Sequence, residues 1–154
     1  MIFGKANQKD IDALVKLRLA YLEEDFGSLS GEQREQIGAV LPDYLRRRLD
    51  RELFVYTARE DGEILACAWL LEVEKPASPA FPTGKTGLVM NVYTKPAYRR
   101  QGLASRLIAA LLAEAREMGI DPVELKATDA GYPVYRKAGF RDTAMTHRPM
   151  IYRM

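Results

Sequence analysis

The chain has 154 residues, 47% of them hydrophobic, which suits one domain over residues 1–154 with a single core. Its formal charge of +2 is too small to indicate nucleic acid or a membrane as a partner, and a single cysteine, Cys67, excludes an internal disulfide framework. No apolar run approaches the roughly 20 residues that span a bilayer. The first residues also lack the layout of a signal peptide, so we expect a cytoplasmic protein.

The chain begins with a predicted edge strand and two helices. Ile2 to Ala6 forms the strand, and Asp10 stands at the N-cap position of the first helix. The second helix covers about residues 31–50, where Pro42 is expected to kink or split it. The apolar stripe of the first helix consists of Ile11, Leu14, Val15, Leu17, Arg18 and Leu22.

A β-hairpin and a long loop follow. Asp61-Gly62 is a strong hairpin signal between a strand over Glu52 to Arg59 and a returning strand over Ile64 to Val73. The segment Lys75 to Gly87 is rich in proline and glycine and predicts an irregular loop.

The second half of the chain alternates strands and helices. A run of hairpin strands followed by crossover units predicts an α/β (α+β) fold, with a mixed sheet and helices on both faces. The expected elements are a strand over Leu88 to Thr94, a helix over Gly102 to Met118, a strand over Val123 to Ala127, a helix from Gly131 to Ala138, and two brief strands over Arg141 to Met145 and His147 to Arg153.

The turn before the long helix has the composition of an anion site. Arg99, Arg100, Gln101 and Gly102 lie directly at the helix N-terminus, where backbone N–H groups lack partners and the helix dipole is positive. Gly102 and Ala104 carry little bulk, so phosphate oxygens can approach the backbone.

This stretch resembles the GNAT superfamily of acyl-CoA-dependent N-acetyltransferases. Arg99-x-x-Gly102-x-Ala104 is similar to the Arg/Gln-x-x-Gly-x-Gly/Ala signature of that family, in which the loop holds the coenzyme A pyrophosphate. About thirty residues later, Tyr135-Arg136-Lys137-Ala138-Gly139-Phe140 is similar to the family's Tyr-x-x-x-Gly-Phe box. The resemblance directly covers about Leu88 to Phe140.

The resemblance implies a binding site for acetyl-CoA and no metal. The GNAT fold has a twisted, mostly antiparallel sheet that splays at its fourth strand, and the backbone of that strand pairs with the acyl and pantetheine amides. Carried over to this chain, the coenzyme-binding residues are Val92, Tyr93, Thr94, Arg99, Arg100, Gln101, Gly102, Leu103, Ala104 and Ser105.

Tyr135 is the candidate general acid. A tyrosine hydroxyl can protonate the thiolate leaving group, and Tyr135 occupies the place of the family's tyrosine, five residues before Phe140. The alternative is that its ring only packs on the core and lines the coenzyme. Tyr132 is a weaker substitute.

The general base is left open. Many relatives use a glutamate on the signature strand, but Leu88 to Tyr93 contains no carboxylate. Asn91 is a candidate for positioning a water molecule or polarising the carbonyl. For each carboxylate below, a plain surface charge is the more common role than a base. The candidates are Glu72, Glu74, Asp129, Glu23 and Glu24.

Two further residues, Thr128 and Asp129, take the place where relatives often carry an asparagine that contacts pantetheine. A threonine hydroxyl can do the same, but both residues also fit a helix cap. His147 is the only histidine, which argues against a histidine triad or a multi-histidine metal site.

The sequence therefore predicts an N-acetyltransferase that moves an acetyl group from acetyl-CoA to a primary amine by direct attack in a ternary complex. The acceptor can be a small amine, an amino-acid derivative or a protein or peptide amine. The alternatives are a non-catalytic acyl-CoA-binding regulatory domain and a nucleotide-phosphate binder. A homodimer is expected by analogy with relatives.

Overall fold

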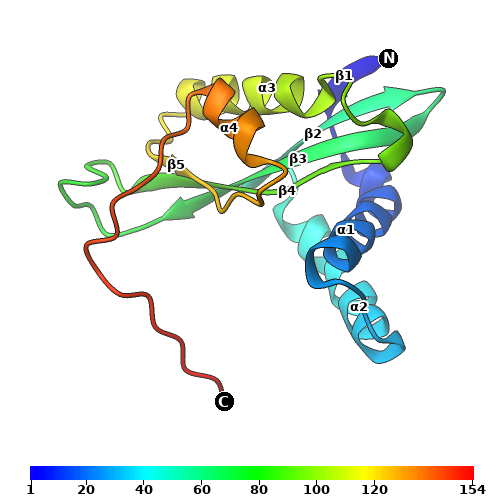
Figure 1. The fold of residues 1–154 in the computed structure, drawn as a ribbon, viewed down its shortest axis with the longest axis horizontal. Coiled ribbons are helices and arrows are strands. Elements are labelled where there is room, and N and C mark those ends of the chain that lie inside the picture. The colour runs from blue at the N-terminus through cyan, green and yellow to red at the C-terminus, as the bar shows by residue number, and fades with distance from the viewer.

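One five-stranded sheet runs through the centre of the molecule (Figure 1). The structure is a computed structural model that describes residues 1–154. Neighbouring strands follow the order of the chain: β1 (Ile2–Lys5), β2 (Leu53–Glu60), β3 (Glu63–Glu74), β4 (Lys85–Thr94) and β5 (Val123–Glu124). The first four strands are antiparallel and β5 is parallel to β4, so the sheet is mixed as predicted.

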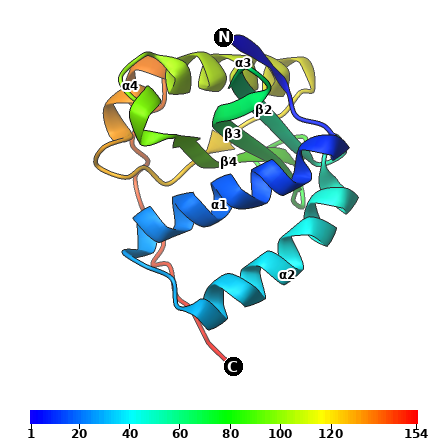
Figure 2. The same ribbon diagram turned by 90° about the vertical axis from the view of Figure 1, so that its right-hand side faces the viewer.

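Helices cover both faces of the sheet (Figure 2). The helices α1 (Ile11–Phe26) and α2 (Gly31–Arg48) lie on one face, and α3 (Leu103–Glu117) and α4 (Tyr132–Ala138) lie on the other. Each face has its own buried cluster, with Leu14, Leu45 and Trp69 on the α1 side, and Leu70 and Leu107 on the α3 side. None of these helices combines the length and apolar character that crossing a bilayer requires.

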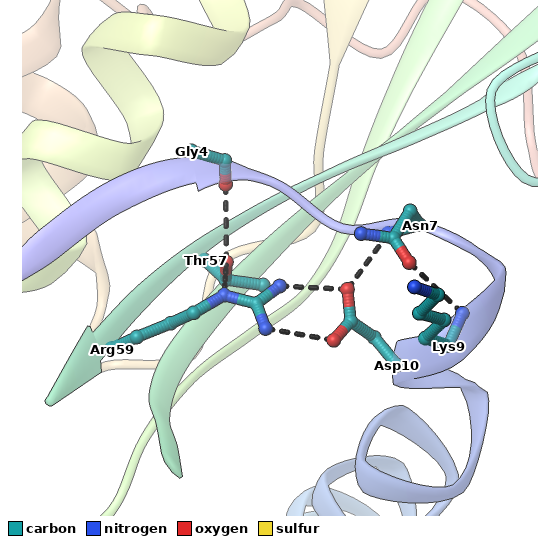
Figure 3. A network of polar contacts seen from close by, with 6 residues as sticks. All are labelled: Gly4, Asn7, Lys9, Asp10, Thr57 and Arg59. Carbon is teal, nitrogen blue, oxygen red and sulfur yellow. Dashed lines mark hydrogen bonds and ion pairs between the residues drawn. The ribbon is translucent and has the colours of Figure 1, made fainter. Parts of the chain in front are cut away.

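Asp10 stands at the N-cap position of α1 as predicted, but its side chain makes no capping bond to that helix. A short 3-10 turn, η1 (Gln8–Asp10), precedes α1, and Asn7 Oδ1 caps it by accepting from Lys9 N at 2.9 Å. Asp10 instead accepts from Asn7 N at 2.8 Å and takes two 2.7 Å bonds from the Arg59 guanidinium (Figure 3). A bidentate ion pair is stronger than a cap, so the carboxylate turns toward β2.

Helix α2 is continuous through Pro42, so the proline does not split it. Ser30 and Gln33 form a reciprocal capping box at its first turn, with bonds of 2.9 and 3.1 Å. Leu45, one turn after Pro42, is fully buried and holds the second half of the helix against the core. That packing offsets the N–H donor that proline lacks.

Strand β4 starts at Lys85, three residues earlier than predicted, and the preceding loop is correspondingly shorter. Its pairing with β3 shifts by one residue at Asn91, whose φ of 49° marks a bulge. On the other side, β5 pairs only with Gly87 and Leu88, so β4 and β5 part beyond this point. The predicted splay of the fourth strand is therefore present.

The C-terminal segment, residues 141–154, contradicts the two predicted closing strands. It has no regular structure, is exposed along its length and extends away from the sheet (Figure 1). A strand needs a neighbour with free backbone groups, and the adjacent β5 is only two residues long instead of the predicted five. The segment thus finds no strand partner within the same chain.

Candidate active site

The parted half of β4 presents free backbone groups. Lys95 N donates to Leu65 O of β3 at 2.9 Å, so in the alternating antiparallel ladder residues 93 and 95 face β3. The N–H and C=O groups of Val92 and Thr94 consequently point to the opposite side, where β5 has diverged. Of the three strand residues predicted to bind the coenzyme, Val92 and Thr94 therefore offer their backbone, whereas Tyr93 pairs with β3.

The start of α3 exposes a row of backbone donors. No hydrogen bond within the protein uses the N–H groups of residues 100–105, and the first helical bond is Arg106 N to Gly102 O at 3.2 Å. Arg100 and Gly102 have φ values of 61° and 77°, which turn the chain sharply into the helix. Nothing lies within 4 Å of the position a Cβ on Gly102 would take. The positive end of α3 is therefore open to an anion.

Arg99 is tied to α1 instead of extending freely beside the turn. Its Nη2 bonds both carboxylate oxygens of Glu24 at 2.7 and 2.8 Å, and its Nε donates to Thr94 O at 2.9 Å. The same Glu24 accepts from the Tyr93 hydroxyl at 3.4 Å, and the guanidinium lies 5.7 Å from the Tyr93 ring centroid. Thr94 O already accepts one bond, whereas the Thr94 N–H has no partner in the protein and is open to a ligand.

Tyr135 projects from α4 into the α3 side of the core. Its ring meets Phe140 edge to face, with the centroids 6.0 Å apart, and its hydroxyl bonds no protein group. Burial, with a smaller contribution from nearby Tyr21, raises the pKa of Tyr135 to about 12. The phenol is therefore fully protonated at neutral pH. Tyr132, the weaker candidate, is exposed and donates to Asp142 at 2.9 Å.

Thr128 stabilises the turn that leads into α4, whose N-cap is Gly131 and not Thr128. Its Oγ1 accepts from Gly131 N at 3.2 Å, and its carbonyl accepts from Gly131 and Tyr132 at 3.1 and 2.9 Å. The turn needs a glycine at 131, since a Cβ there would lie 2.8 Å from the Tyr135 ring. Thr128 thus positions α4 and the phenol, whereas Asp129 is exposed and makes no polar contact.

The candidate carboxylates do not gather at one place. Glu72 lies at the far end of α3, 3.9 Å from Lys85 Nζ, which also bonds Met118 O. Glu74 is exposed on the same strand, and Glu23 pairs with Arg34. Among the candidates, only Glu24 lies beside the turn before α3, where Arg99 engages it.

Asn91 is buried at the β4 bulge, and α1 holds it there through Arg18. Arg18 Nη1 donates to Asn91 Oδ1 at 3.2 Å, and Asn91 Nδ2 lies 3.5 Å from Cys67 Sγ. Burial raises the pKa of the Cys67 thiol to about 12, so it is a core residue and no nucleophile. The sequence reasoning missed Arg18 as a site residue. Its signal was an arginine in an otherwise apolar helix stripe, which marks a charge directed into the fold.

Comparison with known proteins identifies the family. Residues 12–140 match the sequence profile of the Acetyltransferase (GNAT) family. The chain belongs to this family. It is therefore an acyltransferase, and its predicted fold class is confirmed.

Solved GNAT structures match over nearly the whole chain. A predicted acetyltransferase from Clostridium acetobutylicum, crystallised with acetyl-CoA, is 32% identical with a TM-score of 0.85, covering 97% of this chain and 95% of that one. A GCN5-related N-acetyltransferase from Ralstonia eutropha is 28% identical with a TM-score of 0.79, covering 97% of both chains.

Among curated GNAT relatives, the glucosamine 6-phosphate N-acetyltransferase of Trypanosoma brucei brucei is 31% identical over 99 residues. That match covers 63% of this chain and 64% of the relative, so it spans less than two thirds of the relative's own length.

Two features of this GNAT chain fit acetyl-CoA, the acyl donor of the family. The open N–H groups of residues 100–105 suit a pyrophosphate, and the free edge at Val92 and Thr94 suits the amides of pantetheine. No group of three or more His, Cys, Asp or Glu side chains is arranged to hold a metal ion.

Proposed function

We propose that this enzyme transfers an acetyl group from acetyl-CoA to a primary amine by direct attack in a ternary complex. The observation that carries the proposal is the row of unbonded N–H groups at residues 100–105, which opens beside the parted strand β4. The acetyl-CoA in the Clostridium acetobutylicum structure supports it, since that protein is 32% identical. The acceptor is a small amine, an amino-acid derivative or a protein or peptide amine.

The strand edge orients the thioester in this mechanism. The backbone of Val92 and Thr94 pairs with the pantetheine amides, and the N–H groups before α3 neutralise the pyrophosphate. The neutral amine nitrogen then attacks the thioester carbonyl carbon to form a tetrahedral intermediate. Its collapse breaks the C–S bond, and one amine proton ends on the sulfur of free coenzyme A.

Tyr135 stabilises the departing thiolate. With a pKa of about 12, the phenol is a weaker acid than a free thiol near 8.5, so outright proton transfer to sulfur is unfavourable. Its O–H instead donates a hydrogen bond to the negative charge that develops on sulfur. We infer that Tyr135 acts mainly as this donor, and that the proton reaching sulfur comes from the amine.

Strand β4 carries no carboxylate that could take a proton from the amine. The amide of Asn91 is not basic and its Oδ1 accepts from Arg18, and the carboxylate of Glu24 is paired with Arg99, so neither serves as the base. We infer that the ammonium form releases its proton to water before attack. The value of kcat/KM for the amine should then rise with pH until the pKa of the free amine is reached.

An amine panel with detection of free thiol tests the proposal. It should include alkyl amines, amino acids, peptides with free N-termini and, because of the trypanosomal relative, glucosamine 6-phosphate. Calorimetric titration with acetyl-CoA and with ATP runs in parallel. Acetyl-CoA binding without turnover of any amine would favour a non-catalytic acyl-CoA-binding domain. Binding of ATP in place of acetyl-CoA would favour a nucleotide-phosphate site.

We also infer that the protein is a homodimer joined through residues 141–154. This segment exposes large apolar side chains, among them Met150 at 94% and Tyr152 at 84%, and it points away from its own sheet. The run Met150-Ile151-Tyr152 is apolar, and β5 leaves one sheet edge unpaired. Light scattering should give a dimer for the full chain and a monomer for residues 1–142, whereas a monomeric full chain would refute the inference.

A further inference from the structure

The α1 side of the sheet carries a cavity that the acetyl-transfer machinery described above does not use. It has a volume of about 780 Å³ and lies between α1, α2 and the turn that joins them. Its apolar wall includes Leu22, Phe26 and Val40, and the last two are 71% and 68% exposed. Large apolar side chains this open at the rim of a cavity indicate a ligand or partner that covers them.

Arg18 is the only charged residue that lines this cavity. Its guanidinium lies 5.5 Å from the ring centroid of Tyr21 and 6.0 Å from that of Trp69, which fixes its position. The single hydrogen bond it makes goes to the neutral side chain of Asn91, and the ion pairs of the protein do not include it. Burial lowers the pKa of Arg18, and the nearby charge of Asp25, which does not contact the guanidinium, acts in the opposite direction.

The position of Arg18 links the cavity to the reaction. One end of the guanidinium contacts Asn91 at the β4 bulge, next to the strand edge proposed to hold the thioester, and the same side chain lines the cavity. An anion bound to the free nitrogens of Arg18 therefore lies close to the acetyl group. A ligand that fills the cavity and also reaches the acetyl group has to pass this cation.

We propose that the cavity between α1 and α2 binds the acceptor, and that the acceptor is an amine with an anionic group near its nitrogen and an apolar side chain. This inference rests on the proposed acetyl transfer. A planar carboxylate matches the fork of donors that arginine presents, and the apolar wall matches a large aliphatic or aromatic side chain. An apolar α-amino acid has all three parts in the required order.

The wild-type enzyme tests the substrate class without a variant. Three amines are compared. L-leucine carries a carboxylate, leucine amide is its neutral analogue, and glucosamine 6-phosphate carries a phosphate and no apolar side chain. We expect kcat/KM to be at least about tenfold higher for leucine than for its amide, although the less basic amine of the amide would favour the reverse order. Equal or faster turnover of the amide would overturn the inference. A higher kcat/KM for glucosamine 6-phosphate would mean that Arg18 binds a phosphate, and it would overturn the inference that the acceptor has an apolar side chain.

Variants then locate the effect. Arg18→Gln should raise KM for leucine at least about tenfold more than it raises KM for the amide, with partial recovery in Arg18→Lys. Arg47→Gln is the control, because it removes the same charge from an exposed position on α2. If Arg18 only supports the bulge, both amines lose activity equally and the inference fails. If no amine releases thiol from acetyl-CoA, the proposed function itself fails.

Discussion

The two faces of the sheet carry sites of different construction. On the α3 face, the proposed coenzyme site consists of backbone groups within residues 92–105, which are contiguous in the chain. On the α1 face, three polar contacts beside the sheet join side chains far apart in sequence. Arg18 and Asn91 are 73 residues apart, Glu24 and Arg99 are 75 apart, and Asp10 and Arg59 are 49 apart.

This difference matches the two roles proposed for the faces, which are coenzyme binding on the α3 face and acceptor binding on the α1 face. A strand end, a left-handed glycine and a helix start hold a phosphate wherever they occur together, independent of the side chains around them. Such a site suits a ligand that is the same in every relative. The α1 face depends on which side chains meet, so it is the part that can change to suit an acceptor.

The largest expected effect comes from the one side chain on the α3 face that is proposed to act in the chemistry. Tyr135→Phe removes a hydrogen-bond donor from the departing sulfur and should lower kcat about 10²-fold to 10³-fold, as for loss of an oxyanion donor. Tyr132→Phe removes an exposed hydroxyl from the same helix and is the control. Calorimetry should give the same Kd for acetyl-CoA in both variants. Unchanged kcat in Tyr135→Phe would reduce Tyr135 to a packing residue.

A change at Gly102 tests the backbone site itself. Gly102→Val places a β-branched residue at a φ of 77° and puts methyl groups beside the open N–H row, so we expect acetyl-CoA to bind about 10²-fold more weakly. Gly119→Val is the matched control, because its φ is 70°, its surroundings are equally open and it lies at the other end of α3. Both should lose about 1–2 kcal/mol of stability to backbone strain. Equal coenzyme affinity in the two would refute the phosphate role of the turn.

The predictability of the molecule from its sequence follows the same division. Gly102 at a helix start, the Asp61-Gly62 turn and the apolar spacing of α3 are local signals, and the structure has the elements they predict. Arg18 could be flagged only as an anomaly on an apolar stripe. Its contact with Asn91 depends on a bulge that no local pattern announces.

The closing strands failed for a related reason. Residues 141–154 have a strand-like pattern, but pattern does not supply a partner, and the short β5 leaves none within the chain. Asp10 failed as a cap because Arg59 offers a stronger bond from 49 residues away. In both cases the outcome depends on a distant part of the chain, a partner strand or Arg59, which the local sequence pattern does not include.

A moderate effect is expected where β4 and β5 begin to part. A Cβ at Gly87 would lie 2.9 Å from side-chain atoms of both Leu70 and Ile120, so Gly87→Ala should cost about 2 kcal/mol through overpacking. Gly4→Ala, on β1 with nothing within 4 Å, should cost far less. Urea unfolding measures both. If the two variants were equally stable, Leu70 and Ile120 would not enclose Gly87 as tightly as the structure has it.

The smallest expected effect lies on the α1 face, in the pair that joins η1 to β2 (Figure 3). The Arg59 guanidinium holds the pKa of Asp10 below its usual value, so ionised Asp10 stabilises the fold above its unfolded pKa of about 3.9. This contribution disappears as the pH falls through the lower folded value. Asp10→Asn should therefore cost about 1 kcal/mol at neutral pH, a modest value because the pair is partly hydrated.

Measuring unfolding at about pH 7 and about pH 2.5 separates the ion pair from packing, since the deficit of Asp10→Asn should shrink at the lower pH. Asp43→Asn removes a carboxylate that is also paired with an arginine, but on the surface of α2, and should leave stability unchanged. A deficit of equal size at both pH values would mean that Asp10 acts through its bond to the Asn7 N–H, which asparagine weakens without regard to charge. The long-range contacts of the α1 face would then contribute less to stability than the local turn that precedes them.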